Sequence, residues 1–337
     1  MLKRFIYLTI FSVVCFQFSF AQQSFRIINQ IALEGDGGWD YLSMDNINQH
    51  LFVSHGMQVQ VIDVATKKQI GVISNTIGVH GITIANDLNK GFISNGKDSS
   101  VTIFDLKTLA TITKINVSGK NPDAILYDVF SHYVFTFNGK SSNTTVIDAA
   151  TNKVINTIAL DGKPEFAVSD MAGKVYVNIE DKNEIEVINT KEMKVEQKFS
   201  ISPGNEPSGL AIDIEHHRLF SVCDNKLLIV TDAVNGKVVA QIPIGENVDG
   251  VSFDATTKNI FSSNGDGTLS IIHQQNENTY QLVNTLETKK GARTIALNTT
   301  THHLYLPTAE FEKTIEEGSK KHRKIKPNSF TILEIGE

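Results

Sequence analysis

The sequence predicts an all-β protein, a seven-bladed β-propeller of four-stranded antiparallel blades, with its ring closed by an N-terminal strand that pairs into the last blade. First, an aromatic residue within a short apolar segment recurs every 40 to 44 residues, a period typical of propeller blades. Second, another apolar segment follows each of these segments at a similar distance. Third, the last copy lacks its final strand, and residues near the start of the chain can supply it.

The sixth copy shows what one unit contains. Val251 and Phe253 alternate with polar residues, and after a polar turn a second apolar segment follows at 259–262. An Asn-Gly-Asp-Gly turn at 264–267 leads into a third segment at 268–272. Alternation with period two predicts strands, and Gly, Asn and Asp supply the positive φ angles that hairpin turns need. The unit is therefore expected to form antiparallel strands joined by tight turns.

Seven such units are expected in order along the chain. Their second-strand aromatic residues are Phe52, Phe92, Phe135, Tyr176, Phe220, Phe261 and Tyr305. The approximate blades are 37–76, 77–118, 119–161, 162–202, 203–244, 245–289 and 290–337. Most units add a fourth strand after a turn, such as KVINTIAL at 153–160.

The two ends of the chain are expected to complete one blade together. Residues 329–334 form a third strand, after which the chain stops, and residues 25–33 (FRIINQIAL) have the fourth-strand pattern without three strands before them. Pairing the two segments closes the ring and removes two exposed sheet edges. The alternative is a disordered lead at 22–33, which the alternation of that segment disfavours.

The first 21 residues are predicted to be a signal peptide rather than part of the fold. Basic residues at 3 and 4 precede an apolar run at 5–18, and small residues before the expected cleavage, after about Ala21, fit such a segment. The run is shorter than the ~20 residues that cross a bilayer, so we expect no membrane span after processing; a retained anchor is the alternative. Residues 22–337 are then expected to be a single propeller domain, exported and either periplasmic or secreted.

Charge and cysteine content narrow the class of protein. The formal net charge of −6 disfavours a broad nucleic-acid-binding surface, which is normally basic, so nucleic acid is not an expected partner. Of the two cysteines, only Cys223 remains after the signal peptide is removed, so no intrachain disulfide can form. Its side chain is expected to be a small hydrophobe of the core, with a reactive thiol as the alternative.

The second strands carry a degenerate tetrapeptide. It lies within LFVS at 51–54, GFISN at 91–95, VYVN at 175–178 and IFSSN at 260–264, and a V-x-V-I-D-x-x-T-x-K-V stretch is recognisable at 59–67 and 145–154. On these residues the chain resembles the YncE-like, YVTN-repeat β-propeller family over essentially residues 25–337. The resemblance implies the fold and leaves the activity open, because the matching residues build blades.

Polar residues at the starts of the first strands are expected to converge on the channel axis. In each blade the first strand lines the channel, so these residues surround a funnel: Asp40, His80, Asp123, Glu165, Ser208, Asp249 and Arg293. Trp39 is expected to add apolar area to a site for a polar small molecule or peptide, and ring closure favours an ion pair between Arg293 and Asp40. The second-strand ends are expected nearby, at His55, Asn95, Asn138, Glu180, Cys223, Asn264 and Thr308. The alternative is a wet channel mouth whose acids bond only to the backbone.

Catalysis is an alternative use of the funnel. Some seven-bladed propellers are lactonases, and His80 and Glu165, assisted by Arg293, would be the trio for such a reaction, because a histidine near carboxylates can move a proton near neutral pH. The chain has no Gly-x-Ser-x-Gly elbow and no phosphate-binding loop. The other interpretation of His80 is a channel-lining residue bonded to a neighbour.

Metal binding is less favoured by the pattern. Only His80 and His55 are expected near the funnel, and the pairs at 216–217 and 302–303 belong to turns on the opposite face, so a multi-histidine copper cluster is disfavoured. Rim acids or the 264–267 turn could hold Ca²⁺ or another divalent metal, although that turn lacks the carboxylate spacing of a calcium loop.

The segment 310–328 departs most from the repeat. It is expected on the funnel face, between the second and third strands of the last blade, with an acidic first part and a basic second part. Loops of this length in compact domains are often functional. It is interpreted as a lid or partner contact, or as a solvated loop.

Three functions remain open. The first is an exported, non-enzymatic module or scaffold that binds a small molecule, a peptide or a protein through the funnel and the 310–328 loop. The second is a lactonase-like hydrolase or lyase. The third is a structural subunit of a cell-envelope complex, which uses blade edges rather than the channel.

Overall fold

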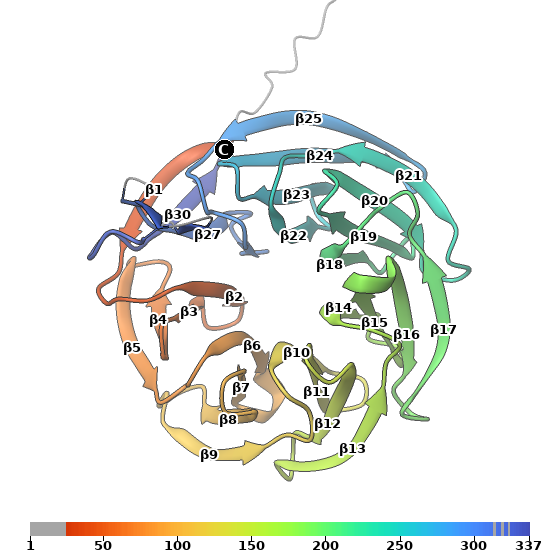
Figure 1. The fold of residues 1–337 in the computed structure, drawn as a ribbon, viewed down its shortest axis with the longest axis horizontal. Helices are drawn as coiled ribbons and strands as arrows, with labels where there is room; N and C mark the ends of the chain where they lie inside the picture. The colour runs from red at the N-terminus through yellow and green to blue at the C-terminus, as the bar shows by residue number, and fades with distance from the viewer. Residues whose placement is uncertain (1–24, 313–314, 318–319, 323) are drawn as a thin grey trace, which may run out of the picture.

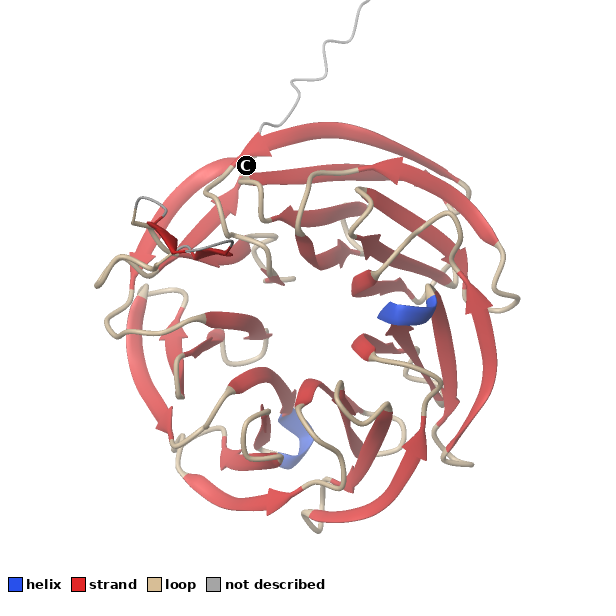
Figure 2. Cartoon of the chain, in the orientation of Figure 1, coloured by secondary structure: helices blue, strands red, loops and turns tan. Residues whose placement is uncertain are grey.

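Seven four-stranded antiparallel sheets stand as blades around a central axis (Figure 1). The structure is a computed structural model that describes residues 25–312, 315–317, 320–322 and 324–337, so the predicted signal peptide lies outside the described residues. Two short 3₁₀ turns, η1 (Asn86–Leu88) and η2 (Glu180–Lys182), stand between strands (Figure 2). None of the helices in these ranges is long and apolar enough to cross a bilayer. The predicted all-β, seven-bladed propeller is confirmed.

The first three blades follow one another along the chain. Blade one contains β2 (Trp39–Asp45), β3 (His50–His55), β4 (Gln58–Asp63) and β5 (Lys68–Ser74). Blade two contains β6 (Val79–Ala85), β7 (Lys90–Asn95), β8 (Ser100–Asp105) and β9 (Thr111–Asn116). Blade three contains β10 (Pro122–Asp128), β11 (Tyr133–Asn138), β12 (Asn143–Asp148) and β13 (Lys153–Ala159).

The next three blades repeat this order. Blade four contains β14 (Pro164–Ser169), β15 (Lys174–Ile179), β16 (Glu184–Asn189) and β17 (Lys194–Ser200). Blade five contains β18 (Pro207–Asp213), β19 (Arg218–Cys223), β20 (Leu227–Asp232) and β21 (Val238–Pro243). Blade six contains β22 (Val248–Asp254), β23 (Asn259–Asn264), β24 (Thr268–Asn276) and β25 (Thr279–Glu287). In each blade the first strand is innermost and the fourth outermost (Figure 1).

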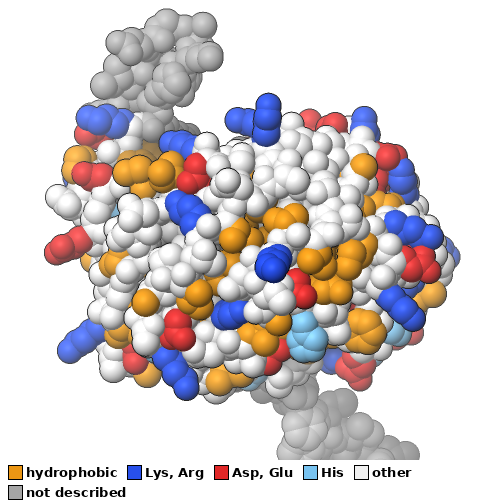
Figure 3. All heavy atoms as spheres, turned by 90° about the horizontal axis from the view of Figure 1, so that it is seen from below, with side chains coloured by type: hydrophobic (Ala, Val, Ile, Leu, Met, Phe, Trp, Pro, Cys, Tyr) orange, Lys and Arg blue, Asp and Glu red, His pale blue; other side chains and the backbone are white. Residues whose placement is uncertain are grey.

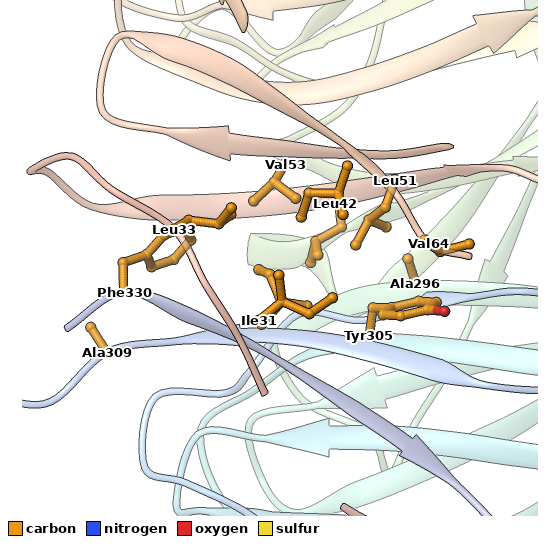
Figure 4. Close-up of a cluster of buried hydrophobic side chains, with 12 residues drawn as sticks. Ile31, Leu33, Leu42, Leu51, Val53, Val64, Ala296, Tyr305, Ala309 and Phe330 are labelled. Atoms are coloured by element: carbon orange, nitrogen blue, oxygen red, sulfur yellow. The ribbon is translucent and has the colours of Figure 1, made fainter. Parts of the chain in front are cut away.

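The seventh blade is assembled from both ends of the chain. It contains β26 (Ala296–Leu297), β27 (Leu304–Thr308), β30 (Thr331–Gly336) and, as its outer strand, β1 (Arg26–Ala32). Ile31 lies opposite Ile332 in the antiparallel register of β1 and β30. Figure 4 shows Ile31 and Leu33 packed with Leu42, Tyr305 and Phe330 in a core shared with blade one. The predicted closure by the N-terminal strand is thus confirmed, and it satisfies the edge that β30 would otherwise expose.

The repeated aromatic residue forms the centre of each blade interface. All seven of these side chains, on β3, β7, β11, β15, β19, β23 and β27, are at most 3% exposed. A large flat ring suits the middle of a twisted sheet, because it covers neighbouring strands and fills the wedge between two blades. Each interface between two blades therefore needs one such aromatic residue, which explains why the residue recurs once per blade.

The repeated Asp-x-x-Thr sequence closes the turn between third and fourth strands. The Oδ1 atom of Asp63 accepts the Thr66 amide at 2.7 Å, and Asp148 accepts the Thr151 amide at the same distance. These amide hydrogen bonds lower the pKa of both carboxyls. The aspartate thus satisfies an amide that the turn leaves without a strand partner.

The outer strands form the side wall of the ring. Figure 3 shows this wall from one side, with hydrophobic side chains interspersed among basic and acidic ones. Ile112 on β9 is 47% exposed and Ile155 on β13 is 42% exposed. Charged neighbours on such outer strands oppose pairing with other chains.

The described residues of the 310–328 segment form a hairpin that extends blade seven. Strands β28 (Ile315–Glu317) and β29 (Lys320–His322) pair antiparallel, and Phe311 bridges Ile325 nearer the blade. Lys326 Nζ lies 2.8 Å from a carboxylate oxygen of Glu310, so at the base of the hairpin basic and acidic residues pair with each other.

Candidate functional site

The first strands begin at one mouth of the central channel, where a cavity of about 340 Å³ opens. We call it the acidic funnel. It is lined by Asp40, Tyr41, His80, Asp123, Lys163, Glu165, Glu180, Glu206, Ser208, Asp224, Val248, Asp249 and Arg293. The structure thus brings together all seven residues that were predicted at the starts of the first strands. Seven carboxylates face two permanently charged cations in this lining, so the funnel carries an excess of negative charge.

Side chains of the second strands hold the funnel backbone in place. Ser94 Oγ donates to the carbonyl of Asp123 at 2.5 Å, and Ser263 Oγ donates to the carbonyl of Arg293 at 2.6 Å. Both serines occupy the third position of the repeated tetrapeptide. The motif therefore positions the first-strand residue of the next blade, which keeps the funnel side chains at fixed places on a rigid frame.

Arg293 connects the last blade to both of its neighbours. Its Nη1 atom lies 3.2 Å from Asp249, and its Nη2 atom lies 3.9 Å from Asp40, in agreement with the expected pair across the ring closure. Burial raises the pKa of Asp249 to about 6, even though the charge of Arg293 opposes this shift. One guanidinium therefore does not neutralise the acids on this side of the funnel.

His80 joins two carboxylates of adjacent blades. Its Nδ1 atom lies 2.6 Å from Asp40 and 3.6 Å from Asp123. Burial alone would lower the pKa of His80, but the hydrogen bond to Asp40 and the negative charges of Asp123, Asp40 and Glu165 raise it. Burial also raises the pKa of Asp123, against the influence of His80. The pKa of His80 and the pKa of Asp123 are therefore both raised within this cluster.

Lys163 forms a second charged cluster with blade-four acids. Its Nζ atom lies 2.6 Å from Glu165 and also contacts Glu180. Burial, followed by the charge of Asp123, raises the pKa of Glu165 despite the bond to Lys163. The excess of carboxylates over cations thus affects blades three and four as well.

Two aromatic rings mark the base of the acidic funnel. The ring centroids of Tyr41 and Phe166 lie 5.3 Å apart, and Tyr41 lines the funnel while Phe166 does not. Burial and the four nearby acids raise the pKa of the Tyr41 hydroxyl well above its usual range. The phenol therefore stays neutral and contributes a ring and a hydroxyl to the site.

Trp39 occupies a different place from the one expected. It is absent from the funnel lining, and its ring packs against Phe330 at a centroid distance of 5.4 Å and against Phe311 at 6.1 Å. Trp39 is the first residue of β2 and Asp40 the second, and neighbouring residues of a strand face opposite sides. The Trp39 side chain therefore turns away from the funnel and toward blade seven. Its role is thus to anchor the 310–328 hairpin to the ring.

Most second-strand ends also face the blade interior rather than the funnel. Asn95 donates to Ser100 at 3.0 Å, and buried His55 bonds to Gln60 at 2.9 Å. Cys223 is buried, which raises the pKa of its thiol to about 12, as suits a core residue. Of the seven second-strand-end residues predicted to lie nearby, only Glu180 lines the funnel.

Four charged or aromatic residues of the funnel lining were not predicted from the repeat: Tyr41, Lys163, Glu206 and Asp224. Asp224 stands four positions after the aromatic residue of its blade, as the predicted Glu180 does, where the other five blades have Gly or Ala. Lys163 and Glu206 stand two positions before a first-strand residue already identified. A carboxylate in a position otherwise kept small is the signal that could have found Asp224, whereas Tyr41 follows a strand-start residue and carries no such signal.

Three funnel residues have the donor types of a metal site. One donor atom each from Asp40, His80 and Asp123 lies within 4.8 Å of the others. Such a mixed nitrogen and oxygen set suits a transition metal better than Ca²⁺, which prefers oxygen ligands. Asp40 already accepts from His80 and lies near Arg293, so a metal ion would compete with both contacts.

Comparisons with known proteins support the architecture. The chain matches no known family and no curated protein. Among the solved structures that resemble it is a chain described as Kuenenia stuttgartiensis hydrazine synthase, with a TM-score of 0.70 and 16% identity over 81% of this chain and 94% of that one. At this identity the likeness shows the propeller fold alone.

Proposed function

We propose that the protein is a non-enzymatic binding module whose acidic funnel holds a small cationic ligand. The observation that carries this proposal is that seven carboxylates face two permanently charged cations, Lys163 and Arg293, in one cavity of about 340 Å³. The raised pKa of Asp249, Glu165 and Asp123 supports it, because burial and then the charge of neighbouring acids disfavour their ionised forms, and a bound cation would oppose both effects. An amine or guanidinium group would supply that charge.

We also propose that the protein is exported and that it is related to a family of propellers. The basic and apolar pattern of residues 1–21 supports a signal peptide cleaved after about Ala21, which would leave residues 22–337 as a periplasmic or secreted protein. The repeated second-strand tetrapeptide supports a relationship to YncE-like, YVTN-repeat propellers. Both features suit a rigid extracytoplasmic binding scaffold.

A lactonase-like enzyme is the second candidate, favoured by the 2.6 Å contact of His80 with Asp40. Such a pair can orient an imidazole as a general base. The trio inferred from the sequence is divided among separate partners, since His80 contacts Asp40 whereas Glu165 contacts Lys163 and Arg293 contacts Asp249. Ser208 Oγ donates to the carbonyl of Val248 at 3.1 Å rather than to an imidazole or a carboxylate. These contacts support binding over turnover.

Isothermal titration calorimetry with putrescine and agmatine, and with succinate as an anionic comparison, tests the proposal at pH 8 in buffer treated with a chelator. We expect saturable binding of the cations only. The combined variant Asp123→Asn, Glu165→Gln and Asp249→Asn should bind at least about tenfold more weakly, because ion pairs in a half-buried site are lost. A matched variant at exposed carboxylates outside the funnel lining, Asp98→Asn, Glu215→Gln and Glu246→Gln, should bind normally.

Two results would lead to another function. Hydrolysis of a lactone or ester panel that disappears with His80→Ala would establish the enzyme. Absence of cation binding together with association of an envelope protein that the funnel variant leaves intact would support a structural subunit that uses blade edges or the 310–328 hairpin.

A further inference from the structure

A second cavity, of about 810 Å³, lies in the same channel beyond the Tyr41–Phe166 pair. We call it the apolar chamber. Its walls come from the first strands of blades one to five, β2, β6, β10, β14 and β18, and its mouth from turns that follow these strands. It opens on the opposite face from the acidic funnel, because residues at strand starts line the funnel and residues at strand ends line the chamber mouth.

The chamber walls are built from hydrophobic side chains. Leu126, Val168 and Ile212 come from three neighbouring blades and are only half-buried. Alternate residues of a first strand face the channel, so these side chains lack a packing partner on the channel side. Water in contact with such walls is displaced favourably by an apolar molecule.

Exposed hydrophobic residues surround the chamber mouth. Ile47 is 74% exposed, Met171 59% and Ile214 38%, and each stands in a turn of a different blade. Single exposed apolar residues are ordinary, but several gathered around one opening indicate a binding site.

Three polar side chains of the chamber, those of Thr83, Ser169 and Tyr127, already bond within the protein. Thr83 Oγ1 accepts the Tyr127 amide at 3.0 Å, Ser169 Oγ donates to Asp128 at 2.5 Å, and the Tyr127 hydroxyl donates to Asp87 at 2.7 Å. Asp87, at the mouth, is the single charged residue among the described residues that line the chamber. The walls therefore offer a ligand mainly apolar contact.

We propose that the apolar chamber binds a neutral, mainly apolar small molecule. Its volume of about 810 Å³ lies within the roughly 300–1,000 Å³ of small-molecule sites. The depth of the chamber argues against a protein partner. A protein docked on the turns would cover Ile47 and Met171 but leave the volume up to Phe166 unfilled. The site is separate from the acidic funnel and does not depend on the function proposed for it.

Binding of N-phenyl-1-naphthylamine, followed by its fluorescence, tests the chamber. The purified protein should bind this neutral probe at one saturable site, and decanol should compete. Val168→Trp fills the chamber, and the double variant Ile47→Lys with Met171→Lys changes only exposed rim positions, so it keeps the fold intact. Each should weaken binding at least about tenfold.

A matched control separates the chamber from general surface hydrophobicity. Ile112→Lys with Ile155→Lys replaces residues of comparable exposure, 47% and 42%, on outer strands and should leave binding unchanged. Absence of saturable binding, or equal weakening by the outer-strand variant, would overturn the proposal. Loss of probe binding in the funnel variant alone would assign the probe to the acidic funnel and would also overturn it. If the rim variants reduced only the capture of a protein and left probe binding unchanged, the proposal would also be overturned.

Discussion

The Nδ1 atom of His80 lies 2.6 Å from the Oδ2 atom of Asp40, and this contact joins blade two to blade one inside the acidic funnel. Although burial acts to lower the pKa of His80, the bond to Asp40 and the surrounding acids raise it. Asparagine at position 40 keeps the size but removes the charge. Asp40→Asn is therefore expected to lower the pKa of His80, as measured by NMR titration of the imidazole.

The same contact gives stability a defined pH dependence. A histidine with a raised pKa stabilises the fold fully below its ordinary value of 6.5, and this contribution is lost as the pH rises through the raised value. Asp40→Asn should reduce that dependence in urea denaturation. Asp87→Asn, which removes the carboxylate 3.1 Å from His132 at the opposite mouth, is the control and should not alter the His80 titration. An unchanged pKa in Asp40→Asn would show that the contact is not electrostatically important.

The ionised carboxylate of Asp249 should destabilise the folded protein above about pH 6. Burial raises its pKa from the usual 3.8 to about 6, so the folded state favours the protonated acid, and stability is lost as the pH rises from about 4 through 6. Asp249→Asn imitates the protonated form. It should raise the free energy of unfolding by about 1–2 kcal/mol at pH 8, after allowance for partial solvent screening, and change it little at pH 4. Urea denaturation at both pH values measures the difference.

A surface carboxylate provides the comparison for Asp249. Glu246 is exposed and pairs with Lys226 at 2.5 Å, so Glu246→Gln should change stability by less than about 1 kcal/mol at either pH. Equal effects of the two variants, or a loss of stability in Asp249→Asn at pH 8, would mean that the pairing with Arg293 outweighs the cost of burying the charge.

The fold was predictable because each blade solves the same packing problem with the same residues. The aromatic of the second strand, the Asp-x-x-Thr turn and the incomplete last copy each have a local signature, and each corresponds to a contact in the structure, such as Asp63 with Thr66 and Ile31 opposite Ile332. Strand alternation then determines which side of each strand is buried.

For the site, the sequence allowed a prediction of which residues lie near the funnel mouth, but not of their contacts with one another. Register placed Asp40, His80 and Arg293 around one mouth, but a single-residue change of strand face moved Trp39 to the Phe330 side, and Asp224, at a position where most blades have glycine or alanine, escaped notice. The division of the channel at Tyr41 depends on contacts between blades distant in sequence, for which a repeat period carries no information.

The Asp-x-x-Thr turn should make a measurable contribution in each blade that has it. Asp148 accepts the Thr151 amide at 2.7 Å, so Asp148→Ala is expected to lower the free energy of unfolding by about 1 kcal/mol near pH 7. Asp148→Asn should retain most of that stability, because Asn189 makes the equivalent bond to the Glu192 amide in blade four. The pKa of Asp148 is lowered by this bond, so the advantage of aspartate is present above its ordinary pKa and disappears as the pH falls through the lowered value. Equal loss in both variants would indicate that the turn depends on charge alone.

The ring closure should be as sensitive to core truncation as any interior blade. Ile31 is 6% exposed, lies opposite Ile332 and packs with Leu42 of blade one, so Ile31→Ala removes contacts from two blades at once. We expect a loss of about 2–4 kcal/mol in the free energy of unfolding, measured by urea denaturation. Ile112→Ala, at a 47% exposed position of an outer strand, is the matched control and should cost less than about 1 kcal/mol. Because β1 protects the edge of β30, Ile31→Ala should also increase concentration-dependent association in light scattering, and a monodisperse variant of unchanged stability would show that β1 is dispensable for closure.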